Sequence, residues 1–235
     1  MPGRMNSLVI LLLALLGQAS SERSFMLTNF ERIRVEGPFD VTVTTGGATG
    51  ARASGDRRAL DRMNLRVDGS TLVISAGTSN SDGWQGSAQS PTVVRVTVPR
   101  LRGALVNGGG RLNVAAMAGQ RVDLGVNGSG TLAVTAVTAD QLTASLTGTG
   151  TITLTGKAGR ATYSSYGAGT IDAAGLAAND ITVRADSSGD SSYAARFTAQ
   201  VYATGIGTVR VAGKMKCIAS GSGPVACGEN VERRR

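Results

Sequence analysis

Residues 126–134 read VNGSGTLAV and residues 146–154 read LTGTGTITL, so one pattern of glycine, apolar and hydroxyl residues returns after twenty positions. Each copy holds a Gly-x-Gly turn, and apolar residues alternate with small polar residues on both sides of it. Such a period-two alternation predicts a strand, a turn and a second strand. The second glycine of the turn recurs about every twenty residues as Gly110, Gly130, Gly150, Gly169, Gly207 and Gly223, with a degenerate copy at Ser187-Ser188-Gly189.

Units of this size cannot bury their own apolar face, whereas stacked units bury one continuous core. We therefore predict an all-β fold, a right-handed parallel β-helix or β-solenoid with coils of about 20 residues over residues 101–227. The hand follows from the usual hand of parallel crossover connections. Glycine is expected at each turn because the corner needs a positive φ and close packing on the neighbouring coil.

Residues 22–100 are also rich in alternating sequence but lack the Gly-x-Gly marker. Asp68-Gly69-Ser70 predicts a turn between two strands, and Arg57–Met63 suits a short helix. Residues 77–91 are rich in serine, glycine and glutamine, which predicts a loop. The loop contains Trp84, which is either a contact anchor for a partner or a side chain that folds back over the column.

Residues 1–21 have the organisation of a secretory signal peptide. A short segment with Arg4 precedes an apolar run over residues 8–16, and small residues follow it. We expect cleavage after Ala19, with Ser21 as the alternative; a buried apolar helix is the other interpretation. A spanning helix needs about 20 apolar residues, so the run over residues 8–16 is too short to serve as a stable anchor, and no apolar run of membrane length follows it. The sequence therefore predicts an exported protein of the periplasm or cell surface, with no integral membrane segment after signal removal.

The two cysteines, Cys217 and Cys227, fall in two inward-facing columns of the last repeat. Disulfides persist in exported proteins, so we predict a bond that ties together the two sides of the terminal coil. Two free thiols are the alternative. Residues 228–235 form a basic tail after this coil.

The composition argues against several classes of function. The 235 residues contain no histidine, which removes the commonest general base and a common metal ligand, so we predict no metal and no cofactor. The net charge of +8 is spread along the chain without interleaved aromatic residues, and we expect no nucleic-acid ligand. The Gly-x-Gly turns lead into predicted strands, whereas a phosphate-binding loop leads into a helix.

Enzyme activity is not expected from the acidic residues either. A glycosidase needs two carboxylates on one face, and Asp172 and Asp186 stand on different sides of a predicted corner. The outward threonines that follow the turns, Thr131, Thr151 and Thr170, would form a flat ladder of hydroxyl groups that suits a sugar or a protein. An ordinary solvated threonine face is the alternative interpretation.

Residues 30–41 read FERIRVEGPFDV, residues 68–74 read DGSTLVI, and serial Gly-Ser-Gly-like turns follow. Over about residues 30–227, these features resemble the putative auto-transporter adhesin, head GIN domain family. The resemblance implies a β-solenoid domain in a bacterial envelope protein, and it implies no catalytic residues.

These observations predict a non-catalytic scaffold or adhesin-like interaction domain of the bacterial envelope, whose partner is an envelope protein or a glycan. The alternative is a carbohydrate-binding module, or a polysaccharide-acting enzyme, built on a β-helix. The sequence leaves the oligomeric state open.

Overall fold

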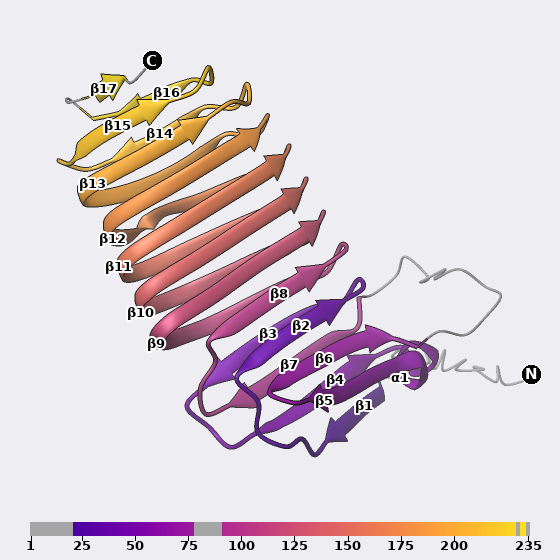
Figure 1. Cartoon of the computed structure of the whole chain (residues 1–235). Coiled ribbons are helices and arrows are strands. Elements are labelled where there is room, and N and C mark those ends of the chain that lie inside the picture. Colours follow the sequence, from indigo (N-terminus) through magenta and orange to yellow (C-terminus); the bar gives the residue numbers. More distant parts are fainter. Residues whose placement is uncertain (1–20, 78–90, 229–230, 234–235) are drawn as a thin grey trace, which may run out of the picture.

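A computed structural model describes residues 21–77, 91–228 and 231–233 (Figure 1). The expected signal peptide up to residue 20, Trp84 with most of its loop, and part of the basic tail lie outside the described residues. The described chain is a stack of β-coils with a small mixed cap at its N-terminal end.

The coils are built from long bent strands that pair in parallel with their neighbours one repeat away. In the first pairs Leu132 lies beside Leu112 and then beside Ile152, so equivalent apolar residues stack in columns. The fold is an all-β solenoid of about 6 turns with coils of about 20 residues, which confirms the fold class predicted from the repeat. The long strands are β9 (Arg111–Gly128), β10 (Thr131–Gly148), β11 (Thr151–Gly167), β12 (Thr170–Ser187) and β13 (Ser191–Ala203).

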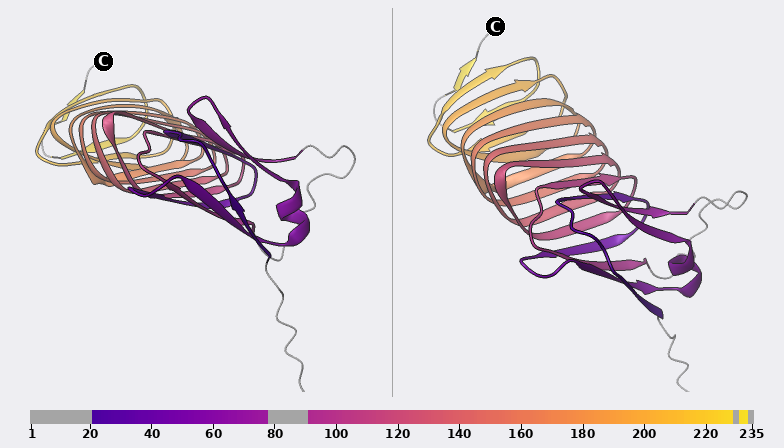
Figure 2. Two further views of the ribbon diagram at one scale, coloured as in Figure 1. Left: turned by 90° about the horizontal axis from the view of Figure 1, so that it is seen from below. Right: turned by 60° about the horizontal axis from the view of Figure 1, so that its bottom comes forward.

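Each coil contributes to two walls that meet at the glycine corner. We call the wall that follows the corner the first wall and the wall that leads up to it the second wall. The flattened column that results is seen from its end in Figure 2. Shorter strands extend the first wall as β3 (Asp40–Thr45), β7 (Val93–Val98), β14 (Val209–Ala212) and β16 (Val225–Cys227). The second wall is extended by β2 (Arg32–Glu36), β6 (Thr71–Ala76), β8 (Gly103–Asn107), β15 (Lys216–Ser220) and β17 (Val231–Arg233).

The order of the coils in space differs from their order in the chain at the N-terminal end. Strand β2 pairs in parallel with both β6 and β8, and β3 pairs with both β7 and β9. The coil formed by β2 and β3 therefore lies between two coils that follow it in the sequence. Its corner is Gly37-Pro38-Phe39, in which Gly37 has a φ of +122° and the buried ring of Phe39 follows.

Antiparallel strands and one short helix close this end of the column. Strand β4 (Gly50–Gly55) pairs with β7 and with β1 (Ser21–Phe25), and β5 (Met63–Asp68) pairs with β6 through the predicted turn at Gly69. Helix α1 (Arg57–Arg62) begins after Asp56, whose carboxylate accepts hydrogen bonds from the N–H groups of the first turn. The helix buries Leu60 against the core.

The inward columns fill the space between the walls with aliphatic side chains. Val106, Val126 and Leu146 form one such column, and each of them is fully buried. Because every inward position stacks on its equivalent in the next coil, the apolar alternation of the repeat becomes one continuous core.

The two requirements predicted for the turn glycines fall on different glycines of each turn. The positive φ falls on the first glycine of the turn, as in Gly128 (+115°) and Gly148 (+113°), and not on the second. The second glycine is required by close packing: at Gly130 and Gly150, a Cβ would lie less than 3.0 Å from the carbonyl oxygen of the preceding coil's turn. The expected positive φ is therefore present at these corners, on the first glycine, and the expected close packing is at the second. The same short approach to a carbonyl oxygen holds at Gly110, Gly169, Gly207 and Gly223.

Candidate functional site

The predicted threonine ladder is present on the outer face of the first wall. Thr131 lies beside Thr151, and Thr151 beside Thr170, in the parallel register of β10, β11 and β12. Their side chains are half-buried. Each backbone N–H donates to the carbonyl oxygen of the second turn glycine of the preceding coil, at 2.9 to 3.1 Å. The ladder is thus a regular surface of small side chains.

The two cysteines form a disulfide, as predicted. Cys217 lies on β15 in the second wall and Cys227 on β16 in the first, with their Cα atoms 6.3 Å apart. The bond crosses the interior of the last coil and joins the two walls where few further strands cover them.

The acidic residues considered for catalysis do not gather at one place. Asp172 points outward from the first wall and Asp186 from the second. Asp190, at the corner, accepts a hydrogen bond from the N–H of Thr208 at 2.8 Å and another from Arg210 at 2.9 Å. These two bonds hold the pKa of the Asp190 carboxyl below its ordinary value. Within the described ranges, no three His, Cys, Asp or Glu side chains are grouped so that they could hold a metal ion.

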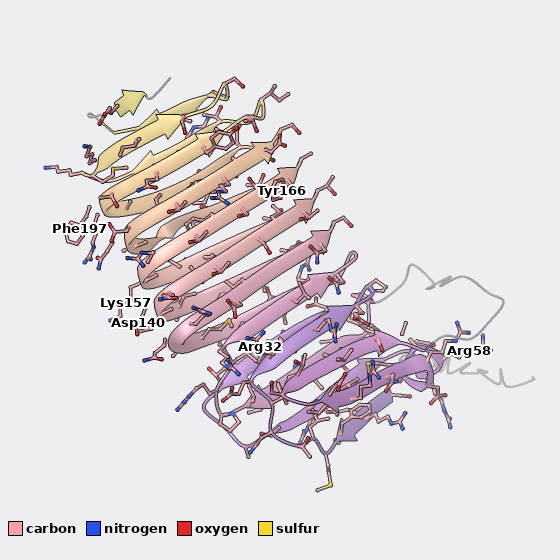
Figure 3. The ribbon with its side chains drawn as sticks, in the orientation of Figure 1. Arg32, Arg58, Asp140, Lys157, Tyr166 and Phe197 are labelled. Atoms are coloured by element: carbon pink, nitrogen blue, oxygen red, sulfur yellow. A yellow bond between two sulfur atoms is a disulfide. The ribbon has the colours of Figure 1, made fainter. Side chains whose placement is uncertain are left out.

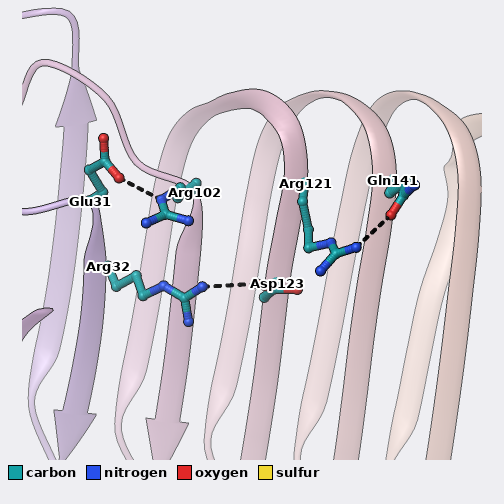
Figure 4. A network of polar contacts seen from close by, with 6 residues as sticks. All are labelled: Glu31, Arg32, Arg102, Arg121, Asp123 and Gln141. Carbon is teal, nitrogen blue, oxygen red and sulfur yellow. Dashed lines mark hydrogen bonds and ion pairs between the residues drawn. The ribbon is translucent and has the colours of Figure 1, made fainter. Parts of the chain in front are cut away.

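A network of charged side chains crosses the second wall near its N-terminal end (Figure 4). Arg102 donates to Glu31 at 2.5 Å, and Arg32 donates to Asp123 at 3.3 Å. The second contact reaches over Gly103, which lies between its partners in the sheet and has no side chain to obstruct it.

These contacts surround a depression of about 350 Å³ whose lining includes Arg32, Arg34, Asp123 and Ser145. Each of the two guanidinium groups already faces a carboxylate, since Arg32 pairs with Asp123 and Arg34 lies 3.4 Å from Glu36. The arrangement therefore suits contacts that hold coils in register better than it suits a vacant ligand site.

The other end of the second wall carries exposed aromatic residues. Tyr166 on β11 and Tyr202 on β13 are 49% and 51% exposed. In register, Tyr166 lies beside Asp186, and Tyr202 lies beside Arg184. We call these four residues the tyrosine patch. In Figure 3, Tyr166 is near the glycine corner, whereas Phe197, Lys157 and Asp140 line the opposite lateral edge.

A groove of about 600 Å³ runs beside Tyr202 and Arg184 over β12, β13 and β15. Its outward polar lining includes Thr182, Gln200 and Ser220. Within the part of the chain that the structure describes, Arg184 has no acidic oxygen within 4 Å, so its guanidinium is available to a ligand. The patch combines two aromatic rings with a free cation and several hydrogen-bonding groups.

The geometry of the patch follows from the regular coils. Tyr166 and Tyr202 are two strands and two residues apart on one face, which places them about 12 Å from each other. This site was not predicted from the sequence, because the contact surface expected there was the outward threonine column of the first wall. The available signal was that two of the four tyrosines, Tyr166 and Tyr202, occupy outward positions of the repeat while Tyr163 and Tyr193 occupy inward ones.

Comparison with known families identifies the chain. The model of the family described as "Putative auto-transporter adhesin, head GIN domain" matches residues 29–214. The chain belongs to this family. The resemblance predicted from residues 30–41 and from the serial turns is thereby confirmed, and none of the curated proteins matches the sequence.

Solved structures of other proteins show the same fold. A putative adhesin from Bacteroides fragilis has a TM-score of 0.79 at 20% identity, covering 93% of this chain and 98% of its own. A putative adhesin from Parabacteroides distasonis has a TM-score of 0.65 at 18% identity (92% and 97% covered), and a "putative lipid binding protein" from the same species has 0.66 at 19% (92% and 97%). At these identities the likeness concerns the fold.

Among the described residues, no helix is both long and apolar enough to cross a membrane.

Proposed function

We propose that this GIN-domain chain is a non-catalytic, adhesin-type binding domain of the bacterial envelope, which attaches to a glycan through the tyrosine patch. The protein acts outside the cytoplasm, in the periplasm or at the cell surface. The solenoid serves as a rigid support that holds the binding groups at fixed spacing.

The observation that carries this proposal is the pair of half-exposed tyrosines with an unpaired arginine between them. Exposed aromatic rings on a flat sheet can stack on the apolar faces of sugar rings, and tyrosine adds a hydroxyl group at its edge. Tyr and Arg are also the residues that most often dominate binding energy at interfaces. A separation of about 12 Å between Tyr166 and Tyr202 suits a ligand of several units, such as an oligosaccharide.

Two further features support the location and the lack of catalysis. The disulfide between Cys217 and Cys227 fits an oxidising compartment outside the cytoplasm. Asp172 and Asp186 lie on the outer faces of opposite walls, so they are not a pair of carboxylates about one scissile bond.

The test is the binding of the oxidised mature chain to purified bacterial envelope polysaccharides, measured by calorimetry over a salt series. We expect saturable binding to at least one polysaccharide, and at least tenfold weaker binding after Tyr166→Ala or Tyr202→Ala. Stacking contacts are little screened by salt, so the binding should persist at high ionic strength.

The matched control is the triple variant Thr131→Ala, Thr151→Ala and Thr170→Ala on the opposite wall, which should bind like the wild type. Loss of binding in this triple variant, with the tyrosine variants unaffected, would place the site on the first wall instead. Shortening of the polysaccharide by the purified protein would contradict a non-catalytic role.

A further inference from the structure

Two arginines lie directly opposite each other on the outer face of the first wall, at the capped end of the column. Arg52 of β4 is the register partner of Arg95 of β7 in an antiparallel pair. Both side chains point outward and are exposed. Directly opposite side chains have Cβ atoms roughly 5 Å apart, and like charges at that distance destabilise a sheet.

The same row continues with hydroxyl groups on both sides. Ser24 of β1 is the register partner of Arg52, and Thr42 of β3 is the partner of Arg95. Four adjacent strands thus present a serine, two arginines and a threonine in one line across the wall. All four side chains can donate hydrogen bonds to an anion.

Several outward arginines of the two walls have an acidic partner. Arg32 pairs with Asp123 across Gly103, Arg102 with Glu31, and Arg210 with Asp190. Arg95, by contrast, has no acidic oxygen within 4 Å in the described ranges.

The positive charge of Arg52 is also poorly compensated by neighbouring carboxylates. Among the described residues its one acidic partner is Glu22, at 3.9 Å, and both of these side chains are largely exposed. Such a contact contributes little. The fold therefore leaves two positive charges together with little compensation.

The two arginines border a groove of about 430 Å³. Its other lining includes the hydroxyl groups of Thr44 and Thr97, while Gly50 leaves space where a side chain would stand. No carboxylate is part of the lining. The groove thus combines two guanidinium groups with hydroxyl donors and open space.

We propose that this groove binds a tetrahedral oxyanion, a sulfate or phosphate group, between Arg52 and Arg95. Guanidinium groups form paired hydrogen bonds with such oxyanions, and a bound dianion cancels the repulsion between the two arginines. The site is on the wall opposite to the tyrosine patch, so it is a second contact point that does not depend on the proposed glycan site. The oxyanion can be free, or can be carried by a polysaccharide ester or a lipid headgroup.

The first experiment uses inorganic sulfate and phosphate at millimolar concentration, with sodium chloride at equal ionic strength as the reference. Calorimetry on the mature chain should show binding that becomes at least tenfold weaker in Arg95→Gln and in Arg52→Gln. The control is the double variant Arg57→Gln and Arg58→Gln, which removes two exposed charges of α1 at the same end and should bind like the wild type. Equal weakening by this control would show general charge attraction and overturn the site.

A second measurement separates a folding defect from a binding defect. Without oxyanions, Arg95→Gln should melt at the same temperature as the wild type or higher, because it relieves the repulsion. Sulfate should raise the melting temperature of the wild type more than that of the variant. Identical responses of the two proteins to sulfate would overturn the proposal.

The carrier is identified with two larger probes, a sulfated polysaccharide and vesicles of anionic phospholipid. The probe that carries the natural group should be retained by the wild type and released by the double variant Arg52→Gln and Arg95→Gln. It should still be retained by Tyr166→Ala, which separates this site from the tyrosine patch. If the double variant retains both probes as well as the wild type does, no such site exists.

Discussion

Tyr163 and Tyr193 pack against each other inside the solenoid, with their ring centroids 4.6 Å apart, although they belong to opposite walls. Each ring stands in a column whose neighbours include alanine: Ala144 beside Tyr163, and Ala173 beside Tyr193. The small residues leave the space that the rings fill, so two aromatic side chains fit into a core otherwise made of aliphatic ones.

Stability should fall in alkaline solution because of these two phenols. Burial raises the pKa of Tyr163, with a smaller contribution from Tyr193, and burial raises the pKa of Tyr193 to about 12. An unfolded tyrosine has a pKa of about 10. Above that pH the unfolded chain loses protons that the native chain keeps, so the free energy of unfolding decreases with pH. The contribution of the two phenols to the free energy of unfolding is constant below pH 10. Between about pH 10 and 12 it falls by roughly 1 kcal/mol per pH unit for each tyrosine.

The measurement is urea unfolding of the wild type and of Tyr193→Phe at several pH values between 9 and 11. The variant should show a shallower decline, because it retains only one buried phenol. Tyr202→Phe, at a half-exposed position, controls for the loss of a phenol as such and should follow the wild type. Parallel curves for the wild type and Tyr193→Phe would contradict the assignment.

The second glycine of each turn should tolerate no larger side chain. In Gly150→Ala the new methyl group would lie within 3.0 Å of the carbonyl oxygen of Gly130 and of the side chain of Val126. The coils would have to separate locally, and we expect a loss of about 1–3 kcal/mol in chemical unfolding. Gly119→Ala is the matched control, because its new methyl group would lie no closer than 3.7 Å to a neighbouring atom, the carbonyl oxygen of Arg121. It should change stability by less than about 0.5 kcal/mol. Equal stability of the two variants would disprove the packing argument.

The repeat predicted the column well, because each strand of the solenoid pairs with its own copy about twenty residues away. The N-terminal coil was harder to recognise. Its corner, Gly37-Pro38-Phe39, keeps the first glycine but has Phe39 where later coils have the second. That substitution hides the marker, and nothing local in the sequence indicates that β2 lies between β6 and β8. This order depends on pairing between segments about seventy residues apart.

Candidate sites that repeat with the coils could be predicted from the sequence, whereas sites formed by single residues could not. The threonine ladder was predictable because it repeats with the coils. The tyrosine patch and the Arg52–Arg95 row each depend on single residues of neighbouring strands. Arg52 and Arg95 are brought together by an antiparallel pairing within the cap, and the twenty-residue repeat does not predict that pairing.

The charged contact between Arg32 and Asp123 should contribute little to stability despite its position across three strands. Both side chains are substantially exposed, at 42% and 37%, and the distance is 3.3 Å. A double-mutant cycle with Arg32→Ala and Asp123→Ala should give a coupling energy of about 1 kcal/mol or less, and the coupling should decrease with salt. A coupling well above this value would mean that the network holds the N-terminal coils together more strongly than its exposure suggests.

The disulfide should stabilise the end of the column more than its middle. Closing the ten-residue separation between Cys217 and Cys227 is worth roughly 2–3 kcal/mol in the chain-entropy model. In a stacked fold each coil contacts mainly its neighbours, so the loss falls first on the coil that holds the bond. The double variant Cys217→Ser and Cys227→Ser should melt at a lower temperature than the oxidised wild type.

Hydrogen exchange should then locate the effect. Amides of β15 and β16 should exchange faster in the double variant, while those of β10 and β11 should exchange as in the wild type, because these strands are several coils away. Reductant should bring the wild type to the behaviour of the variant and leave the variant unchanged. An unchanged melting temperature together with unchanged exchange at the last coil would show that β17 and the strand ends protect the column without the bond.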